Sequence, residues 1–344
     1  MSQAKVTIAI VNSSSFGVSF PEHLRELEQF AELIRVDIPN GAPASAFHQK
    51  LSGADGIIAS VTPVYTREVL LGLPKLRLLA RHGVGCDNVD LDACAELGIA
   101  VSKVGPEVER ESVAQMAVGL MNASARRICE GADVVKAGQW ARRARLALGV
   151  DFAGATIGLI GIGAIGKTVA RILSQGFGAK VIACDPYVSA EEIAARHASK
   201  VDLDTLLADS EIISLHCPLT AETSRMLGAE QIARMRPGVI LVNTCRGEIY
   251  KQADLIAALE SGKVGGYATD VVEGEPIDGN HVLLKTPNVI ITPHLGGYSV
   301  VSLRGMGQTM VEDMRRIFVE GAFPGVIANP QIDLANSRIV RFRK

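Results

Sequence analysis

The chain has 344 residues and a formal net charge of −2, so it can hold two domains and carries no positive excess for binding nucleic acid. Aromatic residues make up 4% of it, which favours aliphatic α/β layers over an aromatic-rich β-sandwich. The six cysteines show no zinc-binding spacing, so we expect reduced thiols and no metal site. The first apolar run spans only residues 6–11, and no later run approaches a membrane-spanning length. We therefore expect a soluble, cytoplasmic protein.

The first hundred residues alternate between strand-like and helix-like patterns. Short apolar runs predict strands, and the segments between them carry apolar residues at helical spacing. This βαβ alternation predicts a parallel sheet covered by helices on both faces. The predicted strands are 6–11, 34–38, 56–60, 76–80 and 99–104, and the predicted helices are 21–33, 44–51, 66–71 and 91–97.

A long helical pattern over residues 112–128 separates this unit from a second alternation. The second alternation also predicts a parallel α/β sheet. A further helical pattern runs from residue 298 to about residue 319. The predicted strands of the second sheet are 155–160, 181–184, 212–215, 239–243, 265–270 and 289–291.

The strongest local signal begins near the middle of the chain. Directly after the predicted strand 155–160, Gly161, Gly163 and Gly166 stand in the spacing GxGxxG. In a dinucleotide site these glycines allow a tight turn, a close approach of the backbone to the pyrophosphate, and close packing of helix on strand. The alternative is a glycine-rich turn in an α/β domain that binds no ligand.

The residues after these glycines support the dinucleotide interpretation. A helix is expected to begin at Ala164 and Ile165, so that its positive end faces the pyrophosphate. Asp185 lies 19 residues after Gly166, at the end of the next strand. A carboxylate there accepts hydrogen bonds from ribose hydroxyls and repels a 2′-phosphate. We therefore expect NAD rather than NADP as the cofactor.

Three further polar residues follow three other strands of the second sheet. Arg246, Glu275 and His294 come after the predicted strands 239–243, 265–270 and 289–291. Ligands of open parallel sheets bind outside the carboxyl ends of the strands, so the three side chains are expected on the cofactor's edge. Arg246 can hold a substrate carboxylate, His294 can transfer the hydroxyl proton, and Glu275 can fix the His294 tautomer. This set suits the interconversion of a 2-hydroxy acid and a 2-oxo acid.

Each of these residues has an alternative interpretation. Arg246 could form a surface ion pair, Glu275 could be a loop acid, and His294 could be a structural histidine. Glu273 competes with Glu275 for the same role, although Pro276 makes the Glu275 position more rigid. His216 also ends a strand, and we interpret it as a non-catalytic wall of the cofactor groove, with proton transfer as the alternative.

Together these motifs resemble the D-isomer-specific 2-hydroxyacid dehydrogenase family, which includes phosphoglycerate, glycerate (hydroxypyruvate), lactate, formate and phosphite dehydrogenases. The resemblance covers nearly the whole chain. It rests on Gly161-x-Gly163-x-x-Gly166 with Asp185, His216-Cys217-Pro218-Leu219-Thr220, Asn243-Thr244-Cys245-Arg246-Gly247, Asp270-Val271 with Glu275-Pro276, Thr292-Pro293-His294, Arg81-His82-Gly83-Val84-Gly85, and Gly138-Gln139-Trp140.

The resemblance implies a fold and a set of site residues. The fold would be a Rossmann NAD-binding domain, residues 105–296, inserted into a flavodoxin-like substrate domain of residues 1–104 and 297–344, each with a doubly wound parallel sheet. Arg246, Glu275 and His294 would be catalytic. Val84 and Gly85 would hold the substrate carboxylate through their N–H groups, and Arg246 and His294 would also contact the substrate. Arg81 and His82 lie beside this loop, where we expect them to contact the C3 end of the substrate. Cofactor contacts would come from Gly161, Gly163, Ala164, Ile165, Gly166, Asp185, His216, Cys217, Pro218, Thr244, Cys245, Asp270 and Gly296.

The resemblance also implies a homodimer, with the 112–128 helix region at the interface. We interpret the run Arg142, Arg143 and Arg145 as a solvated surface or a dimer-contact strip, with capture of an anionic substrate tail as the alternative. One segment departs from the family pattern: Glu109 stands where an Asn is expected, and Gln115 where a Glu is expected. Residues 107–111 are either a solvated helix start or a substrate or cofactor contact that differs from the common members.

Three functions remain open from the sequence. The leading one is an NAD-dependent oxidoreductase that acts on a small, polar D-2-hydroxy acid or its 2-oxo acid, such as glyoxylate or hydroxypyruvate. The second is an NAD(H)-sensing interaction protein, like the family's corepressors, which keep the fold and the catalytic residues. The third is the oxidation of formate or phosphite within the same family.

Overall fold

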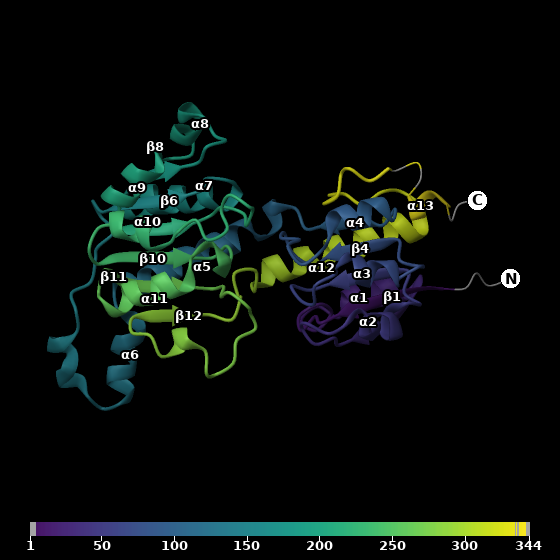
Figure 1. The fold of residues 1–344 in the computed structure, drawn as a ribbon, viewed down its shortest axis with the longest axis horizontal. Coiled ribbons are helices and arrows are strands. Elements are labelled where there is room, and N and C mark those ends of the chain that lie inside the picture. Colours follow the sequence, from purple (N-terminus) through teal and green to yellow (C-terminus); the bar gives the residue numbers. More distant parts are fainter. Residues whose placement is uncertain (1–4, 334, 336, 342–344) are drawn as a thin grey trace. The chain divides into compact units, whose positions relative to one another are not determined.

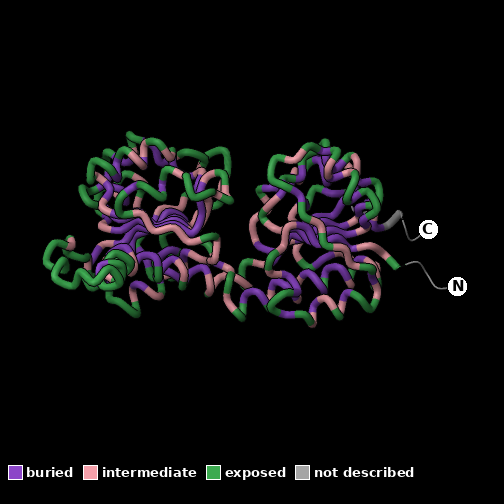
Figure 2. The backbone as a smooth tube through the Cα atoms, turned by 90° about the horizontal axis from the view of Figure 1, so that it is seen from below, coloured by how far each residue is buried: buried purple, intermediate pink, exposed green. Residues whose placement is uncertain are grey.

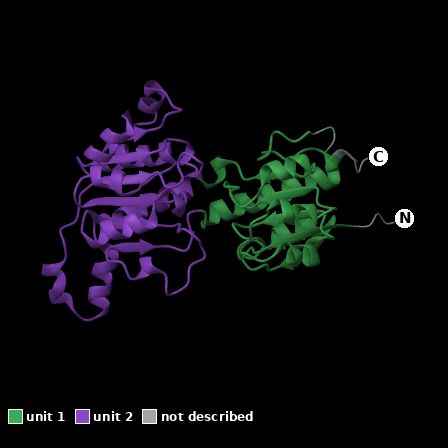
Figure 3. Ribbon diagram, viewed as in Figure 1, with its two compact units in different colours: residues 1–109, 297–344 green, residues 110–296 purple. Residues whose placement is uncertain are grey.

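A computed structural model describes residues 5–333, 335 and 337–341 of the chain. The chain folds into two compact units (Figure 3). Unit 1 is formed by Met1–Glu109 and Gly297–Lys344, and unit 2 by Arg110–Gly296. Unit 1 is therefore built from two segments that the whole of unit 2 separates in sequence. The ends of the predicted outer domain, residues 1–4 and 342–344, lie outside the described residues, as do residues 334 and 336.

Unit 1 contains a five-stranded parallel sheet (Figure 1). Its strand order, β2-β1-β3-β4-β5, is that of flavodoxin-like folds, which confirms the predicted fold class. The strands are β1 (Val6–Val11), β2 (Ala31–Val36), β3 (Gly56–Ala59), β4 (Leu78–Arg81) and β5 (Ala100–Lys103).

Helices cover both faces of this sheet, because successive strand residues point to opposite sides. Ile8 packs in a cluster with α1 and α12, whereas its neighbour Ala9 packs in another with α2, α3 and α4. The buried backbone of the sheet is visible in Figure 2. The helices of unit 1 are α1 (Glu22–Glu28), α2 (Ala44–Leu51), α3 (Arg67–Leu71), α4 (Leu91–Glu96), α12 (Val300–Arg315) and the short α13 (Arg338–Arg341).

The predicted helix over residues 21–33 is too long. Helix α1 ends at Glu28, and the next strand begins at Ala31 instead of residue 34. Leu33 packs on the same side as α1, whereas Ile34 packs on the opposite side of the sheet, so this segment alternates as a strand does. Leu33 also fits the helical spacing of the residues before it. The apolar run is too short to distinguish the helical period of 3.6 residues from the strand period of 2.

Unit 2 contains a seven-stranded parallel sheet with the order β12-β11-β10-β9-β6-β7-β8. Counted from β6, this is the Rossmann order 3-2-1-4-5-6 with one more strand, as predicted. The short strand β8 is the one that the sequence pattern did not indicate. The strands are β6 (Thr156–Ile160), β7 (Lys180–Cys184), β8 (Ser199–Lys200), β9 (Ile212–Leu215), β10 (Val239–Asn243), β11 (Val264–Thr269) and β12 (Val289–Ile291).

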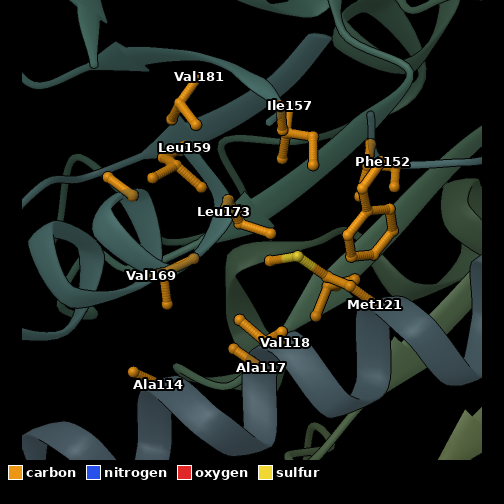
Figure 4. Close-up of a cluster of buried hydrophobic side chains, with 14 of the residues drawn as sticks. Ala114, Ala117, Val118, Met121, Phe152, Ile157, Leu159, Val169, Leu173 and Val181 are labelled. Carbon is orange, nitrogen blue, oxygen red and sulfur yellow. The ribbon is translucent and has the colours of Figure 1, made fainter. Parts of the chain in front are cut away.

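Two buried clusters hold helices on the two faces of this sheet. On one face, α5 presents Ala117, Val118 and Met121 towards Leu173 and Phe152 (Figure 4). On the other, the strands pack against α9, α10 and α11. The helices of this unit, with α5 starting just before it, are α5 (Pro106–Ala125), α6 (Ile128–Lys136), α7 (Ala164–Arg171), α8 (Ala190–Ala195), α9 (Leu203–Asp209), α10 (Ala229–Arg234) and α11 (Gln252–Glu260).

The helix predicted over residues 112–128 begins six residues earlier, at Pro106, and ends at Ala125. Proline is favoured in the first turn of a helix, because its missing N–H has no partner there in any case. Arg127 then takes a left-handed conformation, with φ of 53°, which separates α5 from α6. Among the described residues, no helix is both long and apolar enough to cross a membrane.

Candidate active site

The glycine turn joins β6 to α7, where the strand order of the unit 2 sheet reverses. A Cβ atom on Gly161 would lie 2.6 Å from the carbonyl oxygen of His216, and one on Gly166 would lie 2.5 Å from that of Gly161. Packing therefore requires both glycines. A Cβ atom on Gly163 would meet nothing within 4 Å, so its backbone borders open space. The first turn of α7, with Ala164 and Ile165, begins there without a capping side chain.

This arrangement fits a dinucleotide. The uncapped N-terminus of α7 offers N–H groups and a partial positive charge to a pyrophosphate, and Gly163 permits its close approach. Asp185 lies at the other side of the turn. Its Oδ2 atom accepts a hydrogen bond from the Ile162 N–H over 3.0 Å, and its Oδ1 atom accepts one from the Tyr187 N–H over 3.0 Å. The carboxylate is therefore held against the turn.

One charged neighbour of the turn was missed from the sequence. Arg196, just after α8, donates from Nη1 to the carbonyl oxygen of Ile162 over 2.7 Å. It lies 30 residues beyond Gly166 and outside the GxGxxG spacing, so no sequence signal marked it.

The loop after β9 lies next to the turn and carries His216, Cys217 and Pro218. Neither ring nitrogen of His216 has a hydrogen-bond partner in the part of the chain that the structure describes, and both are buried. Burial lowers the pKa of His216 to about 3, so its ring is neutral near pH 7. Burial also raises the pKa of the Cys217 thiol to about 11. Neither group is poised to exchange a proton, which supports the interpretation of this loop as a wall.

The loop after β10 is organised by Asn243, which is fully buried. Its Nδ2 atom donates to the Arg246 carbonyl oxygen over 2.8 Å, and its Oδ1 atom accepts from the Cys245 N–H over 2.9 Å. This Asx-type turn directs the backbone of Arg246. The Thr244 hydroxyl is buried and has no partner among the described residues, which suits a polar contact with a bound cofactor. Sequence reasoning assigned no role to Asn243, although its place at a strand end was visible.

Glu275 and His294 lie in direct contact. The distance between Glu275 Oε1 and His294 Nδ1 is 2.5 Å, and each side chain is about one-third exposed (29% and 32%). Burial raises the pKa of Glu275, but the hydrogen bond and charge of His294, the Val272 N–H and the charge of Arg246 together hold it below its usual value. Glu275 is therefore ionised at neutral pH, with the Arg246 charge close enough to act on it.

The competing acid, Glu273, has a different partner. Its Oε1 atom accepts a hydrogen bond from Arg225 over 3.2 Å. Glu275, two residues later, is therefore the acid that contacts His294. The Nε2 atom of His294 makes no hydrogen bond within the described chain, so this nitrogen remains available to a substrate oxygen.

His294 itself has a left-handed backbone, with φ of 55°. Such a conformation costs an L-residue about 1–2 kcal/mol, so its surroundings must hold it in place. Asp270 and Gly296, both predicted to contact the cofactor, lie against each other beside it: the Gly296 N–H donates to Asp270 Oδ2 over 2.6 Å. The structure thus brings Arg246, Glu275, His294 and Asp270 to one edge of the unit 2 sheet.

The four substrate residues predicted on unit 1 lie at and just after the end of β4, with Arg81 as the last residue of the strand. Arg81 and His82 are buried, with 5% and 8% of their surface exposed, and Arg81 Nη1 donates to the His82 carbonyl oxygen. The His82 ring packs edge-on against Phe16, with ring centres 5.5 Å apart. Burial, together with the charge of Arg81 and with His23, lowers the pKa of His82 to about 3. These positions favour a role inside unit 1 over direct contact with a substrate.

Val84 and Gly85 are half-buried, and the structure gives their N–H groups no acceptor among the described residues. Two neighbouring unpaired N–H groups suit the binding of a carboxylate.

Residues 107–111, which depart from the family pattern, lie at the start of α5. Glu107 and Glu109 are in the first turn of this helix, where acidic side chains are favourable. The Glu109 carboxyl group lies close to Gly297: a Cβ atom added to Gly297 would be 3.7 Å from the Cδ atom of Glu109.

No group of three or more His, Cys, Asp or Glu side chains that could hold a metal ion occurs in residues 5–333, 335 and 337–341. The candidate site as described consists of the Arg246 cation, the pair of Glu275 and His294, and the glycine turn with Asp185.

Residues 118–296 match the model of the D-isomer specific 2-hydroxyacid dehydrogenase NAD-binding domain. The chain is 33% identical over 318 residues to a glyoxylate reductase of Thermococcus litoralis, covering 91% of this chain and 95% of the relative. It is 39% identical over 266 residues to a hydroxypyruvate reductase of Thermotoga maritima, covering 77% and 83%.

A solved structure shows the same fold. A D-lactate dehydrogenase of Aquifex aeolicus, complexed with NAD and lactic acid, superposes with a TM-score of 0.82 at 30% identity, covering 94% of this chain and 99% of that one. The family model and these relatives agree with the two parallel-sheet α/β units described above. The chain belongs to the NAD-dependent D-isomer specific 2-hydroxyacid dehydrogenases.

Proposed function

We propose that this enzyme interconverts a small, polar D-2-hydroxy acid and its 2-oxo acid, with glyoxylate or hydroxypyruvate as the 2-oxo substrate. The observation that carries the proposal is the contact between Glu275 and His294, beside the positive charge of Arg246. The names of the Thermococcus and Thermotoga relatives support the choice of substrates. In this proposal Arg246, Glu275 and His294 are the catalytic residues.

In the direction of reduction, His294 gives the proton at Nε2 to the C2 oxygen of the substrate. Glu275 accepts the hydrogen bond from Nδ1 and stabilises the protonated ring, and in oxidation the same proton returns to His294. Arg246 holds the substrate carboxylate and polarises the C2 oxygen. The nicotinamide cofactor, when bound, would supply the hydride as NADH in reduction and accept it as NAD in oxidation.

Four groups of residues would hold the cofactor and the substrate carboxylate. The N–H groups of the first turn of α7 bind the pyrophosphate, and Asp185 binds the ribose hydroxyls of NAD and disfavours NADP. Residues at the wall and the strand ends, His216, Cys217, Pro218, Thr244, Cys245, Asp270 and Gly296, complete the cofactor site. On unit 1, the N–H groups of Val84 and Gly85 are proposed to bind a carboxylate. Arg81 and His82, which were predicted to contact the substrate, are proposed instead to shape the loop that carries these N–H groups.

The test is a panel of 2-oxo acids assayed with NADH and with NADPH, with glyoxylate, hydroxypyruvate and pyruvate in one arm. Formate, phosphite and D-glycerate are assayed with NAD in the other. We expect turnover of glyoxylate or hydroxypyruvate, with NADH preferred, and near-complete loss in His294→Ala and Arg246→Ala. Turnover of only formate or phosphite would replace the proposal with that chemistry. Binding of NADH without turnover of any substrate would favour a dinucleotide-sensing protein.

A homodimer belongs to the same proposal. Helix α6 buries only Val134, and the following 3-10 turn, Trp140–Arg145, buries no side chain. Trp140, in this turn, and Leu148, three residues after it, are 65% and 97% exposed. Exposed apolar side chains gathered in one segment indicate a protein partner, and we propose a second copy of the chain.

Analytical ultracentrifugation tests this assembly. We expect a dimer for the unmodified chain and a monomer for the double variant Trp140→Glu with Leu148→Glu. Val319→Glu is the control, because Val319 is also exposed (56%) but lies on unit 1. A monomeric unmodified chain, or a control variant that also dissociates, would contradict this interface.

A further inference from the structure

His294 sits in a loop whose shape the local sequence does not favour. A left-handed backbone at a residue other than glycine persists only when neighbouring groups hold it. The His294 N–H donates to the carbonyl oxygens of Asp270 and Thr292, over 3.0 and 2.9 Å. These bonds fix the backbone of His294. They do not hold Thr292 or the residues after His294, which need a separate support.

The Asp270 carboxylate supplies that support. It is almost completely buried, with 2% of the residue exposed. Its Oδ1 atom accepts from the Thr292 hydroxyl over 2.5 Å and from the Leu295 N–H over 2.8 Å. Its Oδ2 atom accepts from the Gly296 N–H over 2.6 Å. Asp270 therefore holds the loop on both sides of His294, two residues before it and one and two residues after it.

These contacts take up most of what the carboxylate can accept. An ionised carboxylate has about four lone-pair positions, and three of them are used by the loop. Bonds from donors to a buried, charged acceptor are stronger than neutral ones, so the loop has little freedom to shift. A proton-transfer group has to lie within hydrogen-bond reach of its target, and a displacement of about 1 Å can cost roughly 100-fold in rate.

The geometry points to Thr292 and Asp270 as positioning residues for His294: the Thr292 hydroxyl and the Asp270 carboxylate form a clamp that sets the place of the imidazole. This inference rests on the proposed catalytic role of His294 and assigns no contact with substrate to Thr292. It adds a role for Asp270 beyond its proposed contact with the cofactor.

The Thr292 side chain allows a nearly shape-neutral test. Thr292→Val removes the hydroxyl and keeps the volume, whereas Thr292→Ser keeps the hydroxyl and loses only a methyl group. Thr309→Val is the matched control: the Thr309 hydroxyl donates to the Gly305 carbonyl oxygen over 2.9 Å within α12 of unit 1. The three variants are compared with the unmodified enzyme and with His294→Ala.

We expect kcat for the best 2-oxo acid to fall roughly 10- to 100-fold in Thr292→Val, because His294 is displaced from its target. Thr292→Ser should recover most of that loss, and Thr309→Val should leave kcat within about 3-fold of the unmodified enzyme. The dissociation constant of NADH, measured by fluorescence, should change less than about 3-fold in all of them. A split between a lower kcat and an unchanged NADH affinity distinguishes a displaced imidazole from a disrupted cofactor site.

Several outcomes overturn the clamp. A kcat of Thr292→Val within about 3-fold of the unmodified enzyme does so, as does an equal loss in Thr292→Ser. A matching rise in the NADH dissociation constant assigns Thr292 to the cofactor site instead. If His294→Ala retains activity, the proposed function itself fails, so failure of the proposed function can be told apart from failure of the clamp. If circular dichroism shows that Thr292→Val is unfolded, Thr292→Cys replaces it, with a kcat expected between those of the Ser variant and His294→Ala.

Discussion

The Oδ2 atom of Asp185 and the backbone N–H of Ile162 are joined by a 3.0 Å hydrogen bond. The acid at the end of β7 is thereby tied to the glycine turn at the end of β6. The turn and the acid are far apart in sequence, but in the proposed function they form one binding element. An exchange of the acid therefore affects both the selectivity for the ribose and the order of the turn.

We expect Asp185→Ala to lose discrimination between the two dinucleotides. Charge-assisted hydrogen bonds are worth about 1.5–3 kcal/mol, so the ratio of kcat/KM for NADH to that for NADPH should fall roughly 10- to 100-fold. Steady-state kinetics with both cofactors measure this ratio. Asp202→Ala is the control, because Asp202 caps α9 by accepting from the Thr205 N–H. An unchanged ratio in Asp185→Ala would count against its assigned role.

Two glycines of the turn should respond differently to the same added methyl group. In Gly166→Ala the new Cβ atom meets the Gly161 carbonyl oxygen at 2.5 Å, so the backbone must shift. Overpacking of this kind costs about 1–3 kcal/mol, and the melting temperature should fall by several degrees. In Gly163→Ala the methyl group enters open space, so the melting temperature should stay close to that of the unmodified protein.

The same pair separates folding from cofactor binding. The Gly163→Ala methyl group occupies the position from which the backbone approaches the pyrophosphate, so the NADH dissociation constant should rise at least about 10-fold. Calorimetric melting and a fluorescence titration of NADH measure the two effects. A Gly163→Ala variant with unchanged NADH affinity would place the pyrophosphate elsewhere.

Glu275→Gln should lower kcat strongly, because a neutral amide does not stabilise the protonated His294 ring. General acid–base assistance is worth about 10²–10⁴ in rate, and we expect a loss of roughly 100-fold. Glu273→Gln is a matched control two residues earlier, because Glu273 pairs with Arg225. Comparable losses in both variants would refute the assignment of the acid to Glu275.

Stability should decrease towards acid pH because of buried histidines. Burial lowers the pKa of His82 and His216 to about 3, whereas an unfolded chain binds the proton near pH 6.5. Between these values the unfolded state holds more protons, so the free energy of unfolding falls as the pH drops from about 6.5 towards 3. Glu275, with its pKa held below the usual range, adds to the loss at the acid end.

The slope of melting temperature against pH tests this account. Between pH 7 and pH 4.5 we expect a progressive fall in the unmodified protein and a shallower one in His82→Leu, which removes one of the protonation steps. Equal slopes in the two proteins would show that His82 does not contribute.

Much of the fold follows from local patterns. The order of strands and helices and the glycine turn were visible, because buried parallel strands appear as short apolar runs. Residues 31–33 were wrongly predicted as helix, although they belong to β2. Where a strand follows a helix directly, the same apolar residues fit both the helical and the strand spacing. The two-residue strand β8 carries no apolar signal, because both of its residues are exposed.

The sequence predicted the charged residues of the candidate site, but it did not predict the residues that hold them in place by hydrogen bonds. Arg246, Glu275 and His294 stand out because charged or titratable groups follow apolar strands. Asn243 and Thr292 act through hydrogen bonds to particular backbone and carboxylate atoms, and these depend on loop geometry that the sequence pattern does not contain. Burial of His82 likewise depends on packing against Phe16, which comes from a different segment.

The two-segment construction of unit 1 has a consequence for biosynthesis. Ile8 and Ile58 of its sheet pack against Met310 of α12, and α12 is translated only after the whole of unit 2. During synthesis one apolar face of the first sheet is therefore uncovered while nearly 190 residues are added, whereas unit 2 has all its strands before α12 emerges. The nascent chain should thus engage chaperones until α12 leaves the ribosome, and chains that end at residue 296 and have been released from the ribosome should be more sensitive to protease in unit 1 than in unit 2.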